Sequence, residues 1–175
     1  MRPIENWNDI EAKNNEDFKR IVPGGYICRI TKVEDNPEKQ YLYIEFDVAE
    51  GEFTGYGMDF AERNGFTPLR FYRSYSDKAA GMFKSFIADV EESNAPHFHW
   101  DWNEKKLVGR IFGAVLGEEE YRKQNGEIGT RFNVRTKPAS AIRDGKFKVP
   151  EKKTLPVEQT ASFAPLEDDG EGLPF

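Results

Sequence analysis

Cysteine, histidine and long apolar runs are scarce in this chain, and each scarcity argues against a class of protein. Cys28 is the only cysteine among 175 residues, which excludes an internal disulfide, and two histidines, His97 and His99, are too few for a zinc-ligand set. No apolar run approaches the roughly 20 residues of a membrane span, and residues 1–7 lack the apolar stretch of a signal peptide. We therefore expect a cytoplasmic protein without metal, cofactor or membrane contact.

Recognisable catalytic motifs are missing as well. The sequence has no Gly-x-Ser-x-Gly nucleophile motif and no Gly-x-x-x-x-Gly-Lys phosphate loop. Cys28 alternates with apolar positions on an expected core face, and Glu45 and Asp47 read as solvent-side charge on one strand face. The three consecutive acids at 118–120 are expected in a hairpin loop, where carboxylates diverge instead of converging on a metal. The sequence therefore predicts a protein that is not an enzyme.

Composition indicates one globular domain followed by a tail. Of the 175 residues, 38% are hydrophobic and 14% aromatic, which is enough apolar material for a single core. We expect an N-terminal arm over residues 1–22, one domain over 23–155, and a flexible linker with an acidic partner-docking tail over 156–175.

Alternation of apolar and polar residues predicts five strands, over residues 26–33, 41–48, 69–75, 107–116 and 128–137. One helix follows the third strand, with Ser76 or Asp77 as its N-cap and a single apolar stripe formed by Met82, Phe83, Phe86, Ile87 and Val90. Glycines at 109 and 113 indicate a bent or bulged fourth strand. This order predicts a mainly β fold, a five-stranded OB-fold-like barrel with one helix between strands 3 and 4.

Charge is distributed unevenly along the chain, whose net charge is −6. Residues 1–104 have a balance of −8, residues 105–150 of +6, and residues 151–175 of −4. A basic block between acidic ones can give one positive face, and affinity for phosphate follows the local field and not the net charge. Ordinary solvated lysines and arginines are the equal alternative.

Aromatic and basic side chains share the predicted outer faces of the strands. A base stacked on a tyrosine gains roughly 1–3 kcal/mol whatever its identity, and a nearby cation can follow the phosphates. The sequence thus predicts a binding surface for single-stranded nucleic acid, formed by Arg29, Tyr41, Tyr43, Arg70, Tyr72, Arg131 and Arg135. The alternative is that the tyrosines half-cover the sheet and the arginines solvate it. Trp100 and Trp102 either pack their loop onto the body or offer a second stacking site.

The last nine residues, 167–175, carry four acids and no base. Like charges spaced by glycines bury almost nothing, so we expect a solvated segment whose terminal ring, Phe175, can anchor a partner with an apolar pocket and a basic rim. A plain disordered terminus is the alternative. The run of acids that closes on Leu173, Pro174 and Phe175 resembles the acidic tip of bacterial single-stranded DNA-binding proteins, which docks replication and repair proteins. The resemblance implies partner-binding roles for Asp168, Asp169, Glu171, Leu173, Pro174 and Phe175.

Four stretches of the body carry a second resemblance: Ser-Tyr-Ser-Asp-Lys-Ala at 74–79 with Gly-Met-Phe-Lys at 81–84, Trp-Asp-Trp-Asn at 100–103, Val-Leu-Gly-Glu-Glu-Glu-Tyr at 115–121, and Phe-Lys-Val-Pro at 147–150. They are similar to short phage-type single-stranded DNA-binding proteins of Gram-positive hosts. The resemblance implies an OB barrel that binds single-stranded DNA in phage replication or recombination, in the host cytoplasm.

The expected function is therefore binding and protection of single-stranded DNA, with the tail recruiting replication or recombination proteins. Two alternatives stay open: a protein-interaction adaptor without nucleic-acid contact and, less favoured, a metal-dependent nuclease. A homodimer is also considered, because many proteins of this kind pair.

Overall fold

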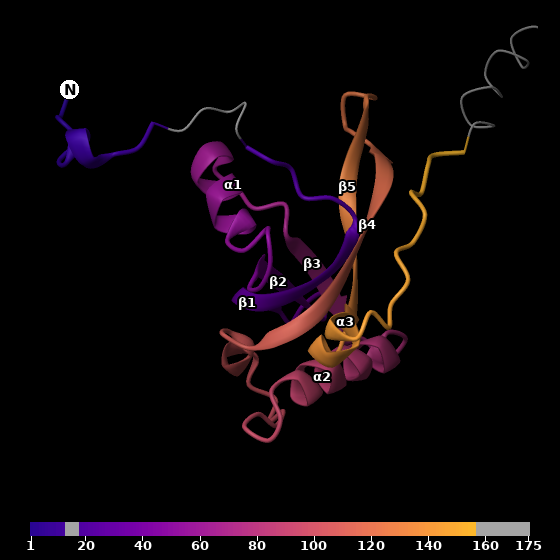
Figure 1. Cartoon of the computed structure of the whole chain (residues 1–175). Helices are drawn as coiled ribbons and strands as arrows, with labels where there is room; N and C mark the ends of the chain where they lie inside the picture. Colours follow the sequence, from indigo (N-terminus) through magenta and orange to yellow (C-terminus); the bar gives the residue numbers. More distant parts are fainter. Residues whose placement is uncertain (13–17, 157–175) are drawn as a thin grey trace, which may run out of the picture.

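A five-stranded antiparallel sheet forms the body of the protein (Figure 1). The computed structural model describes residues 1–12 and 18–156. The strands are β1 (Gly24–Asn36), β2 (Tyr41–Val48), β3 (Arg70–Ser74), β4 (Ile111–Arg122) and β5 (Ile128–Lys137). Their order in the sheet is β3-β2-β1-β4-β5, so β3 and β5 are the edges. The predicted mainly β class, with a helix between the third and fourth strands, is confirmed.

The expected closed barrel is wrong, because the sheet stays open between its two edges. β3 approaches β5, yet within the described residues no hydrogen-bond ladder joins them. Side chains of the helix α2 (Ala80–Ser93) lie at this gap. The Asp89 carboxylate accepts a hydrogen bond from the Thr136 hydroxyl of β5 at 2.8 Å and interacts electrostatically with Arg73 of β3. The two edges are therefore linked through a helix side chain.

A helix that the sequence did not predict, α1 (Tyr56–Asn64), connects β2 to β3. It begins after Gly55 and ends at Gly65, both with positive φ, at 79° and 83°. Its first turn is capped from β2: the backbone amides of Gly57 and Met58 donate to the two carboxylate oxygens of Asp47 at 2.7 and 3.0 Å. The expectation that Asp47 is solvent-side charge is therefore wrong, because this carboxylate satisfies two amides of the helix N-terminus.

The predicted helix is α2, which begins at Ala80, later than the predicted N-cap. Phe83, Phe86, Ile87 and Val90 are buried as expected, whereas Met82 is 64% exposed and does not belong to the apolar stripe. A short helix, α3 (Ala139–Arg143), packs beside α2, and both lie at one end of the sheet (Figure 1). The remaining helical segments are short 3-10 turns at Trp7–Asp9 and Glu104–Leu107.

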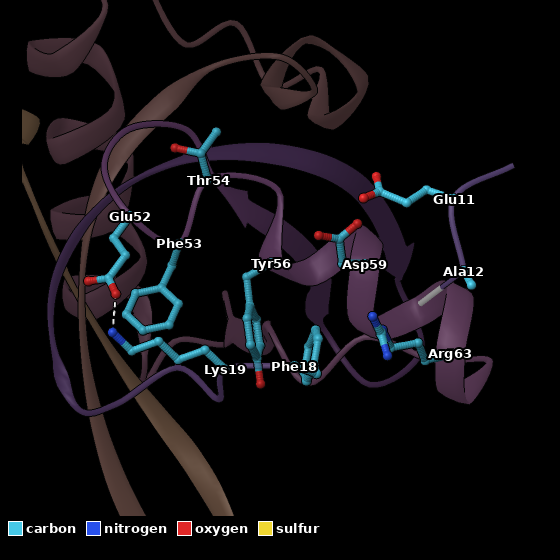
Figure 2. Close-up of a pocket in the computed structure, with 10 residues that line it drawn as sticks. All are labelled: Glu11, Ala12, Phe18, Lys19, Glu52, Phe53, Thr54, Tyr56, Asp59 and Arg63. Carbon is cyan, nitrogen blue, oxygen red and sulfur yellow. Dashed lines mark hydrogen bonds and ion pairs between the residues drawn. The ribbon is translucent and has the colours of Figure 1, made fainter. Parts of the chain in front are cut away.

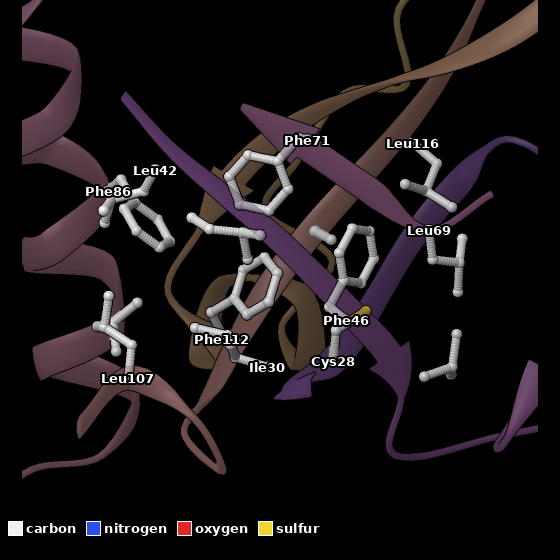
Figure 3. Close-up of a cluster of buried hydrophobic side chains, with 14 of the residues drawn as sticks. Cys28, Ile30, Leu42, Phe46, Leu69, Phe71, Phe86, Leu107, Phe112 and Leu116 are labelled. Atoms are coloured by element: carbon white, nitrogen blue, oxygen red, sulfur yellow. The ribbon is translucent and has the colours of Figure 1, made fainter. Parts of the chain in front are cut away.

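Phenylalanine rings fill the core between the sheet and α2 (Figure 3). Phe46 lies 5.8 Å from Phe71 and 5.4 Å from Phe112, measured between ring centroids, and Phe86 of α2 lies 5.6 Å from Phe71. Edge-to-face pairs of this kind add to the free energy of burial. Cys28 is fully buried beside them, as its strand position predicts.

The fourth strand differs from its prediction in both bounds and glycine function. β4 begins at Ile111 and continues to Arg122, so the acids at 118–120 lie in a strand and not in a loop. A Cβ on Gly113 would come within 2.6 Å of Ile142 of α3, and one on Gly117 within 2.6 Å of Pro150. These glycines leave room for the segment that covers the outer face of the sheet. The shift in strand register lies elsewhere, in β1 between Ile30 and Lys32.

None of the helices among the described residues is long and apolar enough to cross a membrane.

Candidate nucleic-acid interface

Three tyrosine rings meet on the outer face of β2 and β3. Strand alternation turns Tyr41 and Tyr43 away from the core, and the antiparallel register places Tyr43 directly opposite Tyr72. The ring of Tyr72 lies 5.2 Å from that of Tyr41 and 5.2 Å from that of Tyr43, and Tyr72 is 60% exposed. We call Tyr41, Tyr43 and Tyr72 the tyrosine cluster.

Arg70 is the cation beside this cluster. It is exposed on β3, two positions before Tyr72, and its guanidinium lies near the Tyr43 hydroxyl and 5.9 Å from the centroid of the Phe66 ring. Partial burial raises the pKa of Tyr43, and a hydrogen bond from Arg70 opposes that shift. The tyrosine therefore stays protonated at neutral pH, with a hydroxyl that can take part in hydrogen bonds.

The tyrosine cluster and Arg70 line a hollow of about 280 Å³, together with Glu34, Asp35 and Asn36 of β1. Each of these three polar side chains has a partner. Lys32 pairs with Glu34 at 2.9 Å, Tyr75 donates its hydroxyl to Asp35 at 2.7 Å, and Asn36 donates to the Tyr41 hydroxyl at 3.3 Å. The hollow thus combines ring faces, one cation and a row of hydrogen-bonding groups.

The structure brings together four of the seven predicted nucleic-acid-binding residues: Tyr41, Tyr43, Arg70 and Tyr72. Arg29 is exposed but lies away from the tyrosine cluster. Its register partner across the β1–β2 ladder is Asp47, which is about 13 Å further along β2 than Tyr43. Its guanidinium donates to the carbonyl of Gly109 at 2.8 Å.

Arg131 and Arg135 lie on β5, which β1 and β4 separate from the tyrosine-bearing strands in the sheet order. Arg131 pairs with Glu119 at 3.0 Å and stacks over the Tyr121 ring at 5.0 Å. Arg135 is exposed and pairs in register with Val115 of β4. Both arginines point outward as predicted, but neither lines the hollow.

The two tryptophans of the loop between α2 and β4 have different environments. Trp100 packs against Phe83 of α2 at 6.0 Å, whereas Trp102 is 79% exposed. Packing therefore accounts for Trp100 but not for Trp102.

A second hollow, of about 360 Å³, lies between the N-terminal arm and α1 (Figure 2). Its aromatic wall is formed by Phe18, Phe53 and Tyr56, and the Phe18 and Tyr56 rings stack at 5.2 Å. Lys19 and Arg63 lie over these rings, and Lys19 is ion-paired with Glu52. Glu11, Glu52 and Asp59 also line this hollow, so its carboxylates outnumber its cations. No pattern in the sequence predicts this hollow.

The predicted partner-binding residues lie outside the described residues: Asp168, Asp169, Glu171, Leu173, Pro174 and Phe175. Across residues 1–12 and 18–156, no three His, Cys, Asp or Glu side chains gather as metal ligands would.

Comparison of the chain with protein-family models and with curated proteins gives no match in either case.

Proposed function

We propose that this protein binds unpaired nucleic-acid strands, single-stranded DNA in particular, by stacking bases on the tyrosine cluster. The observation that carries the proposal is the convergence of three rings on one outer sheet face, with centroids 5.2 Å from Tyr72 in both pairs. Every base has a π-face, so such a surface takes bases without regard to sequence.

Arg70 is the phosphate contact in this proposal. It lies at the rim of the same hollow, where its guanidinium can reach the backbone of a strand whose bases lie on the rings. The exposed Arg131 and Arg135 of β5 would contact the phosphates of a longer strand. Asn36 and Asp35 offer hydrogen-bonding groups to the edges of a stacked base.

Glu34 and Asp35 oppose phosphate attraction in the hollow, because their carboxylates line it beside a single arginine. The Lys32–Glu34 ion pair reduces this effect at one of the two positions. We therefore expect stacking to supply more of the affinity at this site than phosphate contacts do.

The strand order supports the proposal. An OB barrel opened between its third and fifth strands has the order β3-β2-β1-β4-β5 and a helix between β3 and β4, as this chain does. In OB-folds the face of strands 2 and 3 binds oligonucleotides. The tyrosine cluster lies on that face. We accordingly propose that the sheet is a partly open OB-fold.

The acidic tail completes the proposed function, in which it recruits replication or recombination proteins to the coated strand. Its four acids and terminal Pro-Phe suit a partner with an apolar pocket and a basic rim. Deleting residues 170–175 is expected to abolish capture of that partner while leaving the affinity for oligo-dT equal or higher. Weaker oligo-dT binding after the deletion would contradict this role.

Titration of oligo-dT at two salt concentrations, followed by Trp and Tyr fluorescence, tests the proposal. We expect quenching with nanomolar to micromolar affinity, and a log–log salt slope of about −0.7 for each phosphate contacted. An affinity that does not respond to salt, or no binding at low salt, would contradict it.

One observation favours the adaptor alternative: the carboxylates of Glu34 and Asp35 beside the rings would also suit a basic peptide. The same titration separates the two functions, because an adaptor of this kind gives no quenching with oligo-dT.

A further inference from the structure

Trp102 combines an exposed indole with a backbone conformation that is costly for its residue type. It is 79% exposed, and its φ of 66° lies in the left-handed region that favours glycine. Burial of its ring does not offset this cost, because most of the ring faces solvent. A strained residue that the core does not use points to a function at the surface.

The loop around Trp102 is held in place by polar contacts on both sides. The Trp100 amide donates to the Glu91 carboxylate of α2 at 2.7 Å. After Trp102, the Asn103 side chain accepts from the Lys105 amide at 3.1 Å, and Lys106 forms an ion pair with Asp101. The indole is therefore presented by an ordered loop, which reduces the entropy that a ligand would have to remove.

Cations outnumber acids in the segment that carries this indole, where Lys106 is paired with Asp101 and Arg110 lies over the Phe98 ring. Residues 97–110 contain Lys105, Lys106 and Arg110 against Asp101 and Glu104. Lys105 is exposed two positions before the buried Leu107. The segment that presents this ring thus also carries exposed lysines, and rings and cations are the two kinds of side chain that bind an unpaired nucleotide.

A row of neighbouring rings runs from Trp102 to Tyr75, which is hydrogen-bonded to the wall of the tyrosine-cluster hollow. Trp102 lies 5.9 Å from Trp100, Trp100 lies 6.0 Å from Phe83, and Phe83 lies 5.9 Å from Tyr75. Tyr75 in turn donates its hydroxyl to Asp35, which lines the hollow of the tyrosine cluster. These contacts link the loop that carries the exposed indole to the wall of that hollow.

We propose that Trp102 is a second stacking position for an unpaired base, engaged by strands long enough to extend from the tyrosine cluster. This inference rests on the proposed function, since it assumes that the cluster binds the same strand. Two anchored positions on one strand raise its affinity by effective concentration, whereas a short strand occupies only one of them.

The test compares Trp102→Ala and Trp102→Phe with wild-type protein, using oligo-dT of about 4 and about 16 nucleotides, the range of site sizes for one OB-fold. For the longer strand we expect Trp102→Ala to weaken binding roughly 5- to 150-fold, the range for one stacked base, and Trp102→Phe to restore most of the loss. Binding of the shorter strand should not change. Thermal unfolding of both variants shows whether the loop substitution disturbs the fold.

Fluorescence gives a second readout that does not depend on affinity. With excitation selective for tryptophan, only Trp100 and Trp102 emit in a Trp7→Phe background, and only Trp100 emits in Trp7→Phe/Trp102→Phe. Oligo-dT of the longer length is expected to quench the first protein strongly and the second weakly.

The outcomes separate this inference from the function on which it rests. Equal affinity of wild type and Trp102→Ala for the longer strand, with equal quenching in both backgrounds, overturns the role of Trp102 and leaves the tyrosine cluster standing. Failure of wild type to bind either length overturns both.

Discussion

Tyr43 and Tyr72 face each other across the β2–β3 ladder, with ring centroids 5.2 Å apart and ring planes inclined by 51°. Because Tyr72 lies at the outer edge of this pair and is mostly exposed, it offers the most accessible face for a base. The cross-strand register, and not closeness in sequence, creates the surface.

Replacing Tyr72 with alanine should weaken binding of oligo-dT by roughly 5- to 150-fold, the loss for one stacked base. Tyr72→Phe keeps the ring and should bind within a few-fold of wild type. Fluorescence titration measures both. As a matched control, Trp7→Ala removes an exposed ring from the N-terminal arm and should leave affinity unchanged. Equal binding by Tyr72→Ala and wild type would remove Tyr72 from the site.

Cys28 should resist thiol reagents in the folded protein. It is fully buried, and burial raises the pKa of its thiol far above the ordinary value, with the charge of Asp47 adding to the shift. We expect negligible reaction with a maleimide or an aromatic disulfide at pH 8 and complete reaction of one thiol in urea. Rapid labelling without denaturant would show that this part of the core opens readily.

Gly25→Ala should destabilise the protein by about 1–3 kcal/mol, the usual cost of overpacking. Its new methyl group would lie 2.5 Å from the ring of Phe147, which covers the outer face of β1. Urea unfolding gives the free energy. Gly81→Ala is the matched control: apart from its chain neighbours and the backbone of its own helix, no atom lies within 4 Å of the added carbon, and alanine favours the helix, so stability should rise.

A double variant tests whether the clash with Phe147 causes the loss of stability in Gly25→Ala. Gly25→Ala should cost little once Phe147→Ala has removed the ring. An equal cost of Gly25→Ala in both backgrounds would mean that the clash with Phe147 is not its origin.

Asp47→Ala should cost about 1 kcal/mol or more, because the amides of Gly57 and Met58 lose their acceptors at the start of α1. Asp47→Asn retains one oxygen acceptor and should cost less. Hydrogen exchange at these two amides is the sharpest readout, since both should exchange faster in Asp47→Ala. Unchanged protection would show that the carboxylate does not cap the helix.

Local patterns predicted well those elements whose formation depends on neighbouring residues alone. Alternation of apolar and polar residues predicted the observed bounds of β2, Tyr41–Val48, and of β5, Ile128–Lys137. By contrast, α1 begins where a carboxylate ten positions away supplies its cap, and no local pattern contains that contact. A similar limit applies to Gly113, because the atoms nearest to an added Cβ belong to Ile142 of α3, Lys137 and Pro138, which no local pattern contains.

The same limit separates the site residues that the sequence predicted from those that it did not. Alternation placed Tyr41, Tyr43, Arg70 and Tyr72 on outward faces, and adjacent strands in sequence were also adjacent in the sheet. Alternation does not show how far Arg131 lies from these residues, because that distance depends on the order and curvature of the whole sheet. Trp102 is exposed beside a packed Trp100 and has a left-handed backbone, and alternation predicts neither feature.

Ring-proton chemical shifts of the tyrosines during an oligo-dT titration test the central claim most directly, because a stacked base shifts the protons of the ring beneath it. With all seven tyrosines labelled, the resonances of Tyr41, Tyr43 and Tyr72 should move upfield together as the strand binds, while that of the buried Tyr56 stays in place. Saturable binding that leaves the three cluster resonances unmoved would contradict the account.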